Sequence, residues 1–154
     1  MADQPALRPG PIVRALQGAF ARDAGRQELL QLAARRIQEA GPPYTSVYLY
    51  MLHGGELMLE AFAGRTTEHT RIPVGKGLCG QAVAELRDIN QPDVSTAPGY
   101  LACNADTKAE LIVLIRRGQE ILGQIDVDSD MAAGFPAAEE QAVREVADAL
   151  AVLL

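Results

Sequence analysis

Apolar side chains return every three or four positions over residues 12–40, which is the period of one face of an α-helix. These positions are Ile12, Leu16, Phe20, Leu29, Leu32, Ala33 and Ile37. Gly25 divides the stretch into two predicted helices, and the GPP segment at 41–43 ends the second one. Residues 1–11 are rich in proline and are predicted to form a loose N-terminal arm.

A different pattern follows, in which aromatic and β-branched residues are concentrated in short runs. Residues 44–52 predict a strand, the HGG segment at 53–55 predicts a hairpin turn, and residues 56–63 alternate as the returning strand. Residues 70–73 predict a short third strand. The first half of the chain is therefore predicted to form helices followed by a hairpin.

The second half contains another hairpin and a closing helix. Residues 110–116 and 120–128 predict two strands with a turn at Gly118. After Phe135 and Pro136, an amphipathic pattern predicts a terminal helix. Its apolar stripe consists of Val143, Val146, Ala147, Leu150 and Leu153.

Between the hairpins, Gly75 opens a short predicted helix that ends near Leu86, and the chain from there to Lys108 has few periodic apolar positions. Long loops of this kind are uncommon in compact domains unless they are functional. We therefore expect residues 12–154 to form a single α+β domain with an antiparallel sheet. The N- and C-terminal helices would cover one face, and the other face would hold a loop-covered ligand pocket.

Composition narrows the classes of function. A chain of 154 residues with 48% apolar and 22% charged residues is typical of one globular domain. The net charge of −6 disfavours nucleic acid and membranes as partners, because phosphates and anionic lipids are negative too. The sequence shows no pattern of a secretory leader and no apolar run long enough to span a bilayer, so we expect a cytoplasmic protein.

The cysteine content bears on redox chemistry and metals. Two cysteines are fewer than small disulfide-stapled secreted domains usually carry, which indicates a reducing compartment. Neither lies in a CxxC motif, and the two histidines, His53 and His69, do not complete a convincing zinc set. We expect no metal and no cofactor.

Three carboxylates are the first candidate for chemistry. The strand period puts Asp126 and Asp128 on one face, roughly 6.5–7 Å apart, while Ile125 and Val127 point to the helical layer. The two aspartates either cap turns in water or lie beneath the long loop, where they would bind a cationic group or hold a proton. Glu110, at the head of the neighbouring strand, is either an exposed strand end or a third member of this cluster.

Two short segments carry the cysteines. Cys79 lies in GKGLCG (75–80) near a predicted helix N-terminus, where a thiolate is favoured, although a buried small apolar residue is the alternative. Cys103 lies in the loop segment GYLACN (99–104), where core packing is less expected. If their Cα atoms come within about 7 Å, the two can form a disulfide. Tyr44 and Tyr48 are predicted on one strand face, as core or as an aromatic wall for a thioether.

Four segments together resemble a known family. They are RIPVGKGLCGQAV (71–83), PDV (92–94), PGYLACNADTKAE (98–110) and GQIDVDS (123–129). Their order and spacing are similar to those of the free methionine-(R)-sulfoxide reductases, which are small enzymes built on a GAF domain. The flanking helices and strands fit a GAF domain over nearly the whole chain.

The resemblance implies a mechanism based on two thiols. One cysteine attacks the sulfur of free methionine sulfoxide, a sulfenic acid forms, and a second cysteine converts it to a disulfide that thioredoxin or a similar thiol reduces. We expect Cys103 to attack, because its loop is predicted to lie nearest the carboxylates, and either Cys79 or an external thiol to resolve the sulfenic acid. The resemblance also assigns the substrate ammonium to Glu110, Asp126 and Asp128.

Departures from the family pattern leave a second hypothesis open. Tyr44, a candidate substrate-binding residue, stands at the strand position usually held by a tryptophan, Asn104 replaces an aspartate, and His69 replaces the first of three usual cysteines. The alternative function is therefore a non-catalytic GAF module that binds or senses a small molecule. A third hypothesis is an interaction domain that dimerises through its terminal helices, and a homodimer also suits the reductase.

Overall fold

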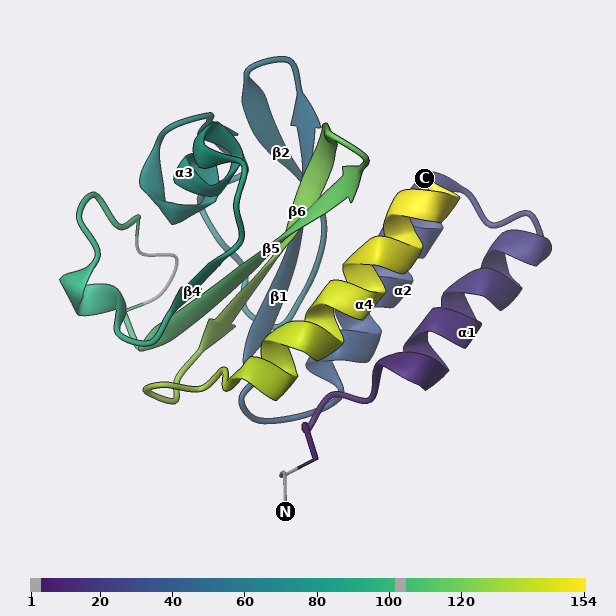
Figure 1. Ribbon diagram of the computed structural model, residues 1–154, viewed down its shortest axis with the longest axis horizontal. Helices are drawn as coiled ribbons and strands as arrows, with labels where there is room; N and C mark the ends of the chain where they lie inside the picture. The colour runs from purple at the N-terminus through teal and green to yellow at the C-terminus, as the bar shows by residue number, and fades with distance from the viewer. Residues whose placement is uncertain (1–3, 102–104) are drawn as a thin grey trace.

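A computed structural model describes residues 4–101 and 105–154 and shows a six-stranded antiparallel sheet with helices on both faces (Figure 1). The helices are α1 (Pro9–Ala21), α2 (Arg26–Gln38), α3 (Gly77–Glu85) and α4 (Ala137–Leu153), with a 3₁₀ turn at Val94–Thr96. The strands are β1 (Ser46–His53), β2 (Glu56–Ala63), β3 (Arg71–Pro73), β4 (Ile89–Gln91), β5 (Ala109–Arg117) and β6 (Glu120–Ser129). Their order across the sheet is β3-β2-β1-β6-β5-β4, which confirms the predicted α+β class.

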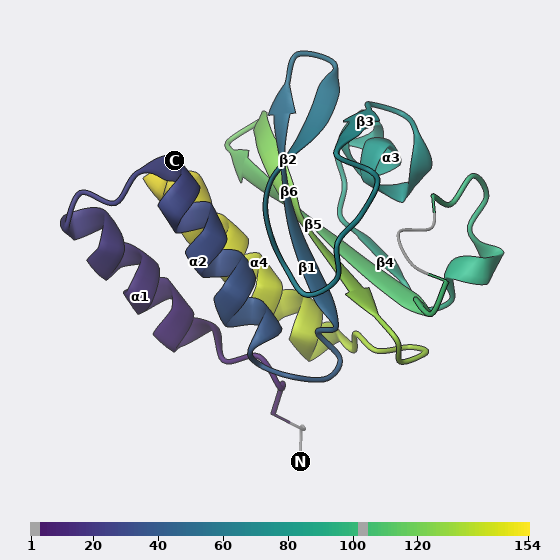
Figure 2. The same cartoon turned by 180° about the vertical axis from the view of Figure 1, so that it is seen from behind.

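One face of the sheet is covered by α2 and α4, and α1 packs on the outside of these two helices (Figure 2). The side chains buried between these helices and the sheet form the larger apolar core. From β6 it takes Ile125 and Val127, as the strand period predicted, and from β1 it takes Val47, Leu49 and Met51. This helical face is the main source of hydrophobic stabilisation.

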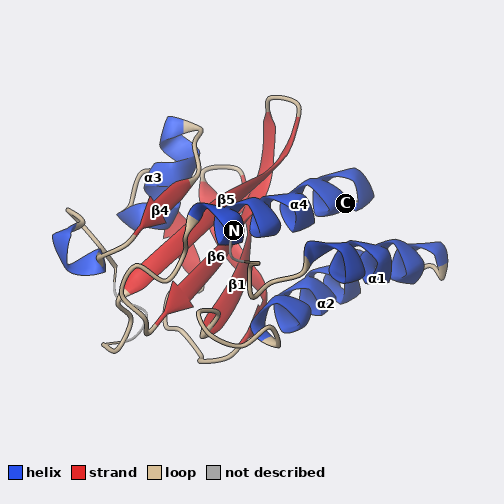
Figure 3. Ribbon diagram, turned by 60° about the horizontal axis from the view of Figure 1, so that its bottom comes forward, coloured by secondary structure: helices blue, strands red, loops and turns tan. Residues whose placement is uncertain are grey.

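The opposite face carries α3 and the connection through β4, and Figure 3 shows α3 on the far side of the strands from the other helices. A second, smaller cluster of buried residues lies there, with Tyr48 and Tyr50 of β1 and Cys79 of α3. We call this side of the sheet the pocket face. Because strand side chains alternate, β1, β5 and β6 each contribute to both faces.

The structure corrects the predicted start of the fold. Residues 6–11 are not a loose arm, because α1 begins at Pro9 and Leu7 is buried in the helical-face core. Proline is tolerated in the first helical turn, where an amide N–H would lack a partner in any case. The predicted break between the first two helices is confirmed, with Gly25 as the N-cap of α2.

The central connection has more structure than the apolar pattern predicted. Ile89–Gln91 forms the edge strand β4, which pairs with β5 and was missed because three residues are too few to establish a period. No helix in the described part of the chain is long and apolar enough to cross a membrane.

Candidate functional site

Three carboxylates lie together on the pocket face. Glu110 of β5 is directly opposite Asp128 of β6 in the antiparallel register, and Asp126 is the next residue of β6 on the same face. All three are buried, with exposed fractions of 4%, 3% and 0% for Glu110, Asp128 and Asp126. Burial of this many acidic groups is rare unless they serve a ligand or a partner.

The helix α3 brings Cys79 onto this cluster. The Cys79 thiol lies 3.3 Å from Asp126 Oδ2 and 3.9 Å from Glu110 Oε2, and the Gln124 amide donates to the Cys79 carbonyl at 3.0 Å. Gly80 makes this approach possible, because a Cβ there would lie 2.5 Å from the Pro73 carbonyl oxygen. A glycine beside the cysteine therefore allows α3 to sit close to the sheet.

Burial controls the protonation of the aspartates. Removal from water raises the pKa of Asp126, although hydrogen bonds to Glu110 and Cys79 act in the opposite direction. The pKa of Asp128 is raised well above its ordinary value, first by burial and then by the negative charge of Asp126. The cluster therefore holds protons more tightly than exposed aspartates do, which suits a group that delivers a proton.

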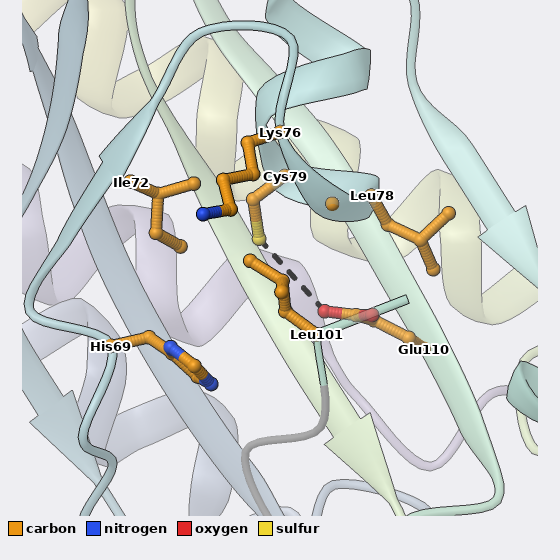
Figure 4. A pocket seen from close by; sticks show the side chains of 8 residues that line it. His69, Ile72, Lys76, Leu78, Cys79, Leu101 and Glu110 are labelled. Carbon is orange, nitrogen blue, oxygen red and sulfur yellow. Dashed lines mark hydrogen bonds between the residues drawn. The ribbon is translucent and has the colours of Figure 1, made fainter. Parts of the chain in front are cut away.

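A small cavity of about 10 Å³, room for about one water molecule, lies beside Cys79 and Glu110 (Figure 4). It is lined by His69, Ile72, Lys76, Gly77, Leu78, Cys79, Leu101 and Glu110. The Cys79 sulfur and the Glu110 carboxylate point toward each other across it, and His69 lies at the side away from α3 (Figure 4). The cavity thus combines acidic, basic and apolar walls, as sites for amphoteric small molecules do.

Two tyrosines of β1 hold the segment that leads to His69. The Tyr50 hydroxyl donates to the His69 carbonyl at 2.6 Å, and the Tyr48 hydroxyl donates to the Arg65 carbonyl at 2.9 Å. The Arg65 guanidinium makes two hydrogen bonds with Asp130, which anchors the same segment to the end of β6. These contacts fix the backbone of residues 65–69 beside the cavity.

The predicted site residues divide into three groups. Glu110, Asp126, Asp128 and Cys79 come together on the pocket face, whereas the sequence had left the placement of Glu110 and Cys79 open between alternatives. Cys103 lies outside the described residues. The placement of Tyr44 is corrected: it precedes β1, lies in the helical-face core and donates its hydroxyl to Glu139, so it does not share a face with the carboxylates.

Sequence reasoning missed several residues of the site. Gln124 has the same strand parity as Asp126, and Tyr50 has the same parity as Tyr48, so the period of two could have assigned them to the pocket face. Lys76 gave no usable signal, because a lysine before a helix is usually solvated. Its place at the cavity depends on the turn from β3 into α3.

Comparison with known proteins agrees with this geometry. The family model for the GAF domain matches residues 23–154. The type II free methionine-R-sulfoxide reductase from Thermoplasma acidophilum, whose structure is solved, is 37% identical, with 90% of this chain and 93% of that chain covered and a TM-score of 0.77. This chain belongs to the free methionine-R-sulfoxide reductase family of GAF domains.

Two further members of the free methionine-R-sulfoxide reductase family are similar to the chain. The Escherichia coli protein is 34% identical over 97 residues, which are 63% of this chain and 58% of that protein, so the match spans less than two thirds of the relative. The Neisseria meningitidis protein, solved with its substrate, is 26% identical, with 99% and 92% of the two chains covered and a TM-score of 0.87.

Proposed function

We propose that this protein reduces free methionine-(R)-sulfoxide to methionine. The observation that carries the proposal is the group of three buried carboxylates beside a buried thiol and a small cavity. Among the ion pairs of the described residues, none includes Asp126 or Asp128, so these buried acids have no fixed cation. The ammonium group of a free amino acid would supply one.

The residues around the cavity offer a partner for each end of an amino acid, which would have to widen this space on binding. Glu110 would receive the ammonium group together with the aspartates behind it, and Lys76, at the rim, would attract the α-carboxylate. Ile72, Leu78 and Leu101 provide apolar surface for the thioether part of the side chain. A methionine inside a peptide lacks the free ammonium group, so this arrangement favours the free amino acid.

In the proposed reaction, the Cys103 thiolate attacks the sulfoxide sulfur while a proton reaches the sulfoxide oxygen. The oxygen is transferred to the cysteine, which becomes a sulfenic acid, and methionine leaves. Asp126 and Asp128 are suited to supply the proton, because burial raises the pKa of both. The Cys79 thiol donates to Asp126, so its sulfur is engaged within the cluster and is less suited to attack first.

Recycling would use the second cysteine. The Cys79 thiol condenses with the sulfenic acid, releases water and forms a Cys79–Cys103 disulfide, which two electrons from thioredoxin or a similar dithiol reduce. Because the chain has two cysteines and carries His69 at the position of the third family cysteine, Cys79 is its remaining internal resolving group.

The test is turnover of free L-methionine-(R)-sulfoxide with dithiothreitol and with a thioredoxin system. We expect the R epimer to be consumed, and we expect N-acetylmethionine-(R)-sulfoxide, which lacks the ammonium group, to react at least about a hundredfold more slowly. Equal rates for the two substrates would contradict the assigned role of the carboxylates. Absence of turnover with either would contradict the reductase itself.

Cysteine variants assign the two thiol roles. Cys103→Ser should abolish even a single turnover, because the attacking atom is lost. Cys79→Ser should still release one equivalent of methionine and then accumulate sulfenic acid, detectable by dimedone labelling and mass spectrometry. The reverse pattern would exchange the two assignments.

His69 favours a second candidate, a GAF module that binds methionine or its sulfoxide without efficient recycling. Such a protein would bind the free amino acid in calorimetry and would show no steady-state turnover with any thiol. His69→Cys should then increase turnover, because it restores the family's third thiol beside the cavity.

A further inference from the structure

We propose that the Cys79 thiol and the carboxylates of Glu110 and Asp126 form a binding site for one zinc ion on the pocket face. The three donor atoms come from three different elements, α3, β5 and β6, and lie within 4.8 Å of one another. All three side chains are buried. The spacing of cysteines and histidines along the chain could not indicate this site, because two of its ligands are carboxylates on separate strands.

The distances match a tetrahedral zinc ion. With zinc–sulfur bonds of about 2.3 Å and zinc–oxygen bonds of about 2.1 Å, tetrahedral ligands place sulfur about 3.6 Å from each oxygen. The Cys79 sulfur lies 3.3 Å from Asp126 Oδ2 and 3.9 Å from Glu110 Oε2, on either side of that value. The two sulfur–oxygen distances therefore each need a shift of only a few tenths of an ångström to suit the ion.

Unpartnered polar atoms around the donors are an independent indication of a ligand. Gln124 is fully buried and its amide nitrogen donates to the Cys79 carbonyl, yet its Oε1 atom has no hydrogen-bond partner among residues 4–101 and 105–154. The same is true of Asp126 Oδ1. Buried oxygens without donors are costly, and a cation or the water bound to it would satisfy them.

The chemistry of the donor set selects the ion. A thiolate with two carboxylates suits zinc, which accepts both sulfur and oxygen ligands, better than magnesium or calcium, which prefer oxygen alone. Zinc displaces the Cys79 thiol proton, which leaves to solvent, and the sulfur becomes a thiolate ligand. The adjacent cavity leaves the fourth position to water.

Zinc would occupy the place that we assign to the substrate ammonium and would withdraw the resolving thiol. This consequence rests on the proposed function, whereas the metal site itself does not. Zinc binding and methionine sulfoxide binding should therefore exclude each other. A rise in the free zinc concentration would then inhibit the reductase.

The test uses the reduced, chelator-treated full chain, with Co²⁺ as a spectroscopic probe and Zn²⁺ in competition with a chromophoric chelator. We expect one metal equivalent, a thiolate-to-cobalt charge-transfer band in the near ultraviolet, and release of about one proton or more per zinc ion. X-ray absorption of the zinc form should give one sulfur ligand with oxygen ligands. A sulfur-free first shell, or no binding, would overturn the proposal.

Variants identify the ligands. Cys79→Ser should remove the band and weaken zinc binding at least about tenfold, and Asp126→Asn, of nearly the same shape, should weaken it by a similar factor. Cys103→Ser is the matched thiol control and should keep both the band and the affinity. Loss of the band in Cys103→Ser instead of Cys79→Ser would overturn the assignment. Circular dichroism checks that each variant is folded.

A competition experiment separates the metal site from the proposed function. In Cys103→Ser, which cannot turn over, zinc should raise the apparent dissociation constant of free methionine sulfoxide in proportion to its occupancy. If zinc binds through Cys79 but leaves sulfoxide binding unchanged, the metal site stands and the assigned ammonium site fails. If sulfoxide binds but zinc does not, the assigned ammonium site stands and the metal site fails.

Discussion

The two faces of the sheet are built from the same strands and differ in almost everything else. On β6, Ile125 and Val127 enter an apolar core against three helices, whereas Gln124, Asp126 and Asp128 face a cluster of acids and a thiol. The helical face gains stability from each buried side chain, while the pocket face buries oxygens that lack partners. Because side chains alternate along a strand, residues 124–128 contribute to the stabilising core on one face and to the candidate site on the other.

The largest effect should follow from moving an acid to the wrong face. In Val127→Asp a carboxylate enters the helical-face core, where Val127 is fully buried among apolar side chains. We expect a loss of more than about 4 kcal/mol in the free energy of unfolding, measured by urea titration. Val127→Thr, of similar shape, should lose about 1–3 kcal/mol. A Val127→Asp protein with the parent midpoint would contradict the contrast between the faces.

The helical side also buries a carboxylate, that of Glu139, but its oxygens have hydrogen-bond donors. Glu139 accepts hydrogen bonds from the Ala6 and Leu7 amides and from the Tyr44 hydroxyl, and burial with this bond raises the pKa of Tyr44. Glu139→Gln replaces one acceptor oxygen by an NH₂ group facing these donors. We expect a loss of about 1.5–3 kcal/mol in thermal or urea unfolding.

The neighbouring Glu140 gives the control for this variant. It lies one residue further along α4 and is only partly buried. Glu140→Gln should change stability by less than about 0.5 kcal/mol. Equal effects at the two positions would mean that the bonds to the N-terminal segment contribute nothing specific.

On the pocket face, removal of a buried carboxylate should increase the free energy of unfolding, which is the opposite of the effect expected at Glu139. Folding raises the pKa of Asp128, so its cost to stability is absent below the ordinary aspartate pKa of about 3.9 and grows as the pH rises above it. Asp128→Asn should therefore gain about 1–2 kcal/mol at pH 7, with the gain shrinking toward pH 4, and should lose affinity for the amino acid. Thermal unfolding across this pH range measures it.

Asp130 is the matched control two residues away. Its ion pair with Arg65 lowers its pKa, so its stabilising contribution is present above the ordinary aspartate value and is lost as the pH falls through the lowered one. Asp130→Asn should slightly reduce stability at pH 7. Gains of the same sign in both variants would indicate a general charge effect on the acidic chain.

Much of this arrangement could be read from the sequence. The parity of residues 125–128 assigned both faces correctly, and the motif around Cys79 indicated that it flanks the pocket, although not that it contacts the acids. The error at Tyr44 has a physical cause: the turn after Gly41 delays the strand until Ser46, so the strand period does not extend back to position 44. Aromatic content indicated a strand there but carried no information on where pairing with β6 begins.

Contacts between distant segments could not be read in this way. The bond from Tyr50 to the His69 carbonyl joins β1 to a loop that has no period, and the approach of Cys79 to Asp126 depends on the close packing of α3 at Gly80. Both result from the path of the chain between β2 and α3, which local patterns do not determine.

The smallest expected effect tests those tertiary contacts. Tyr50→Phe removes the hydroxyl that donates to the His69 carbonyl at 2.6 Å and should cost about 0.5–1.5 kcal/mol. Because His69 lines the cavity, the loss should also raise the KM for free methionine sulfoxide roughly twofold to fivefold with little change in kcat. Tyr48→Phe frees the Arg65 carbonyl instead, at a residue that does not line the cavity, so it should show a similar stability loss without the KM change. Identical kinetics in the two variants would mean that the position of His69 has no part in substrate binding.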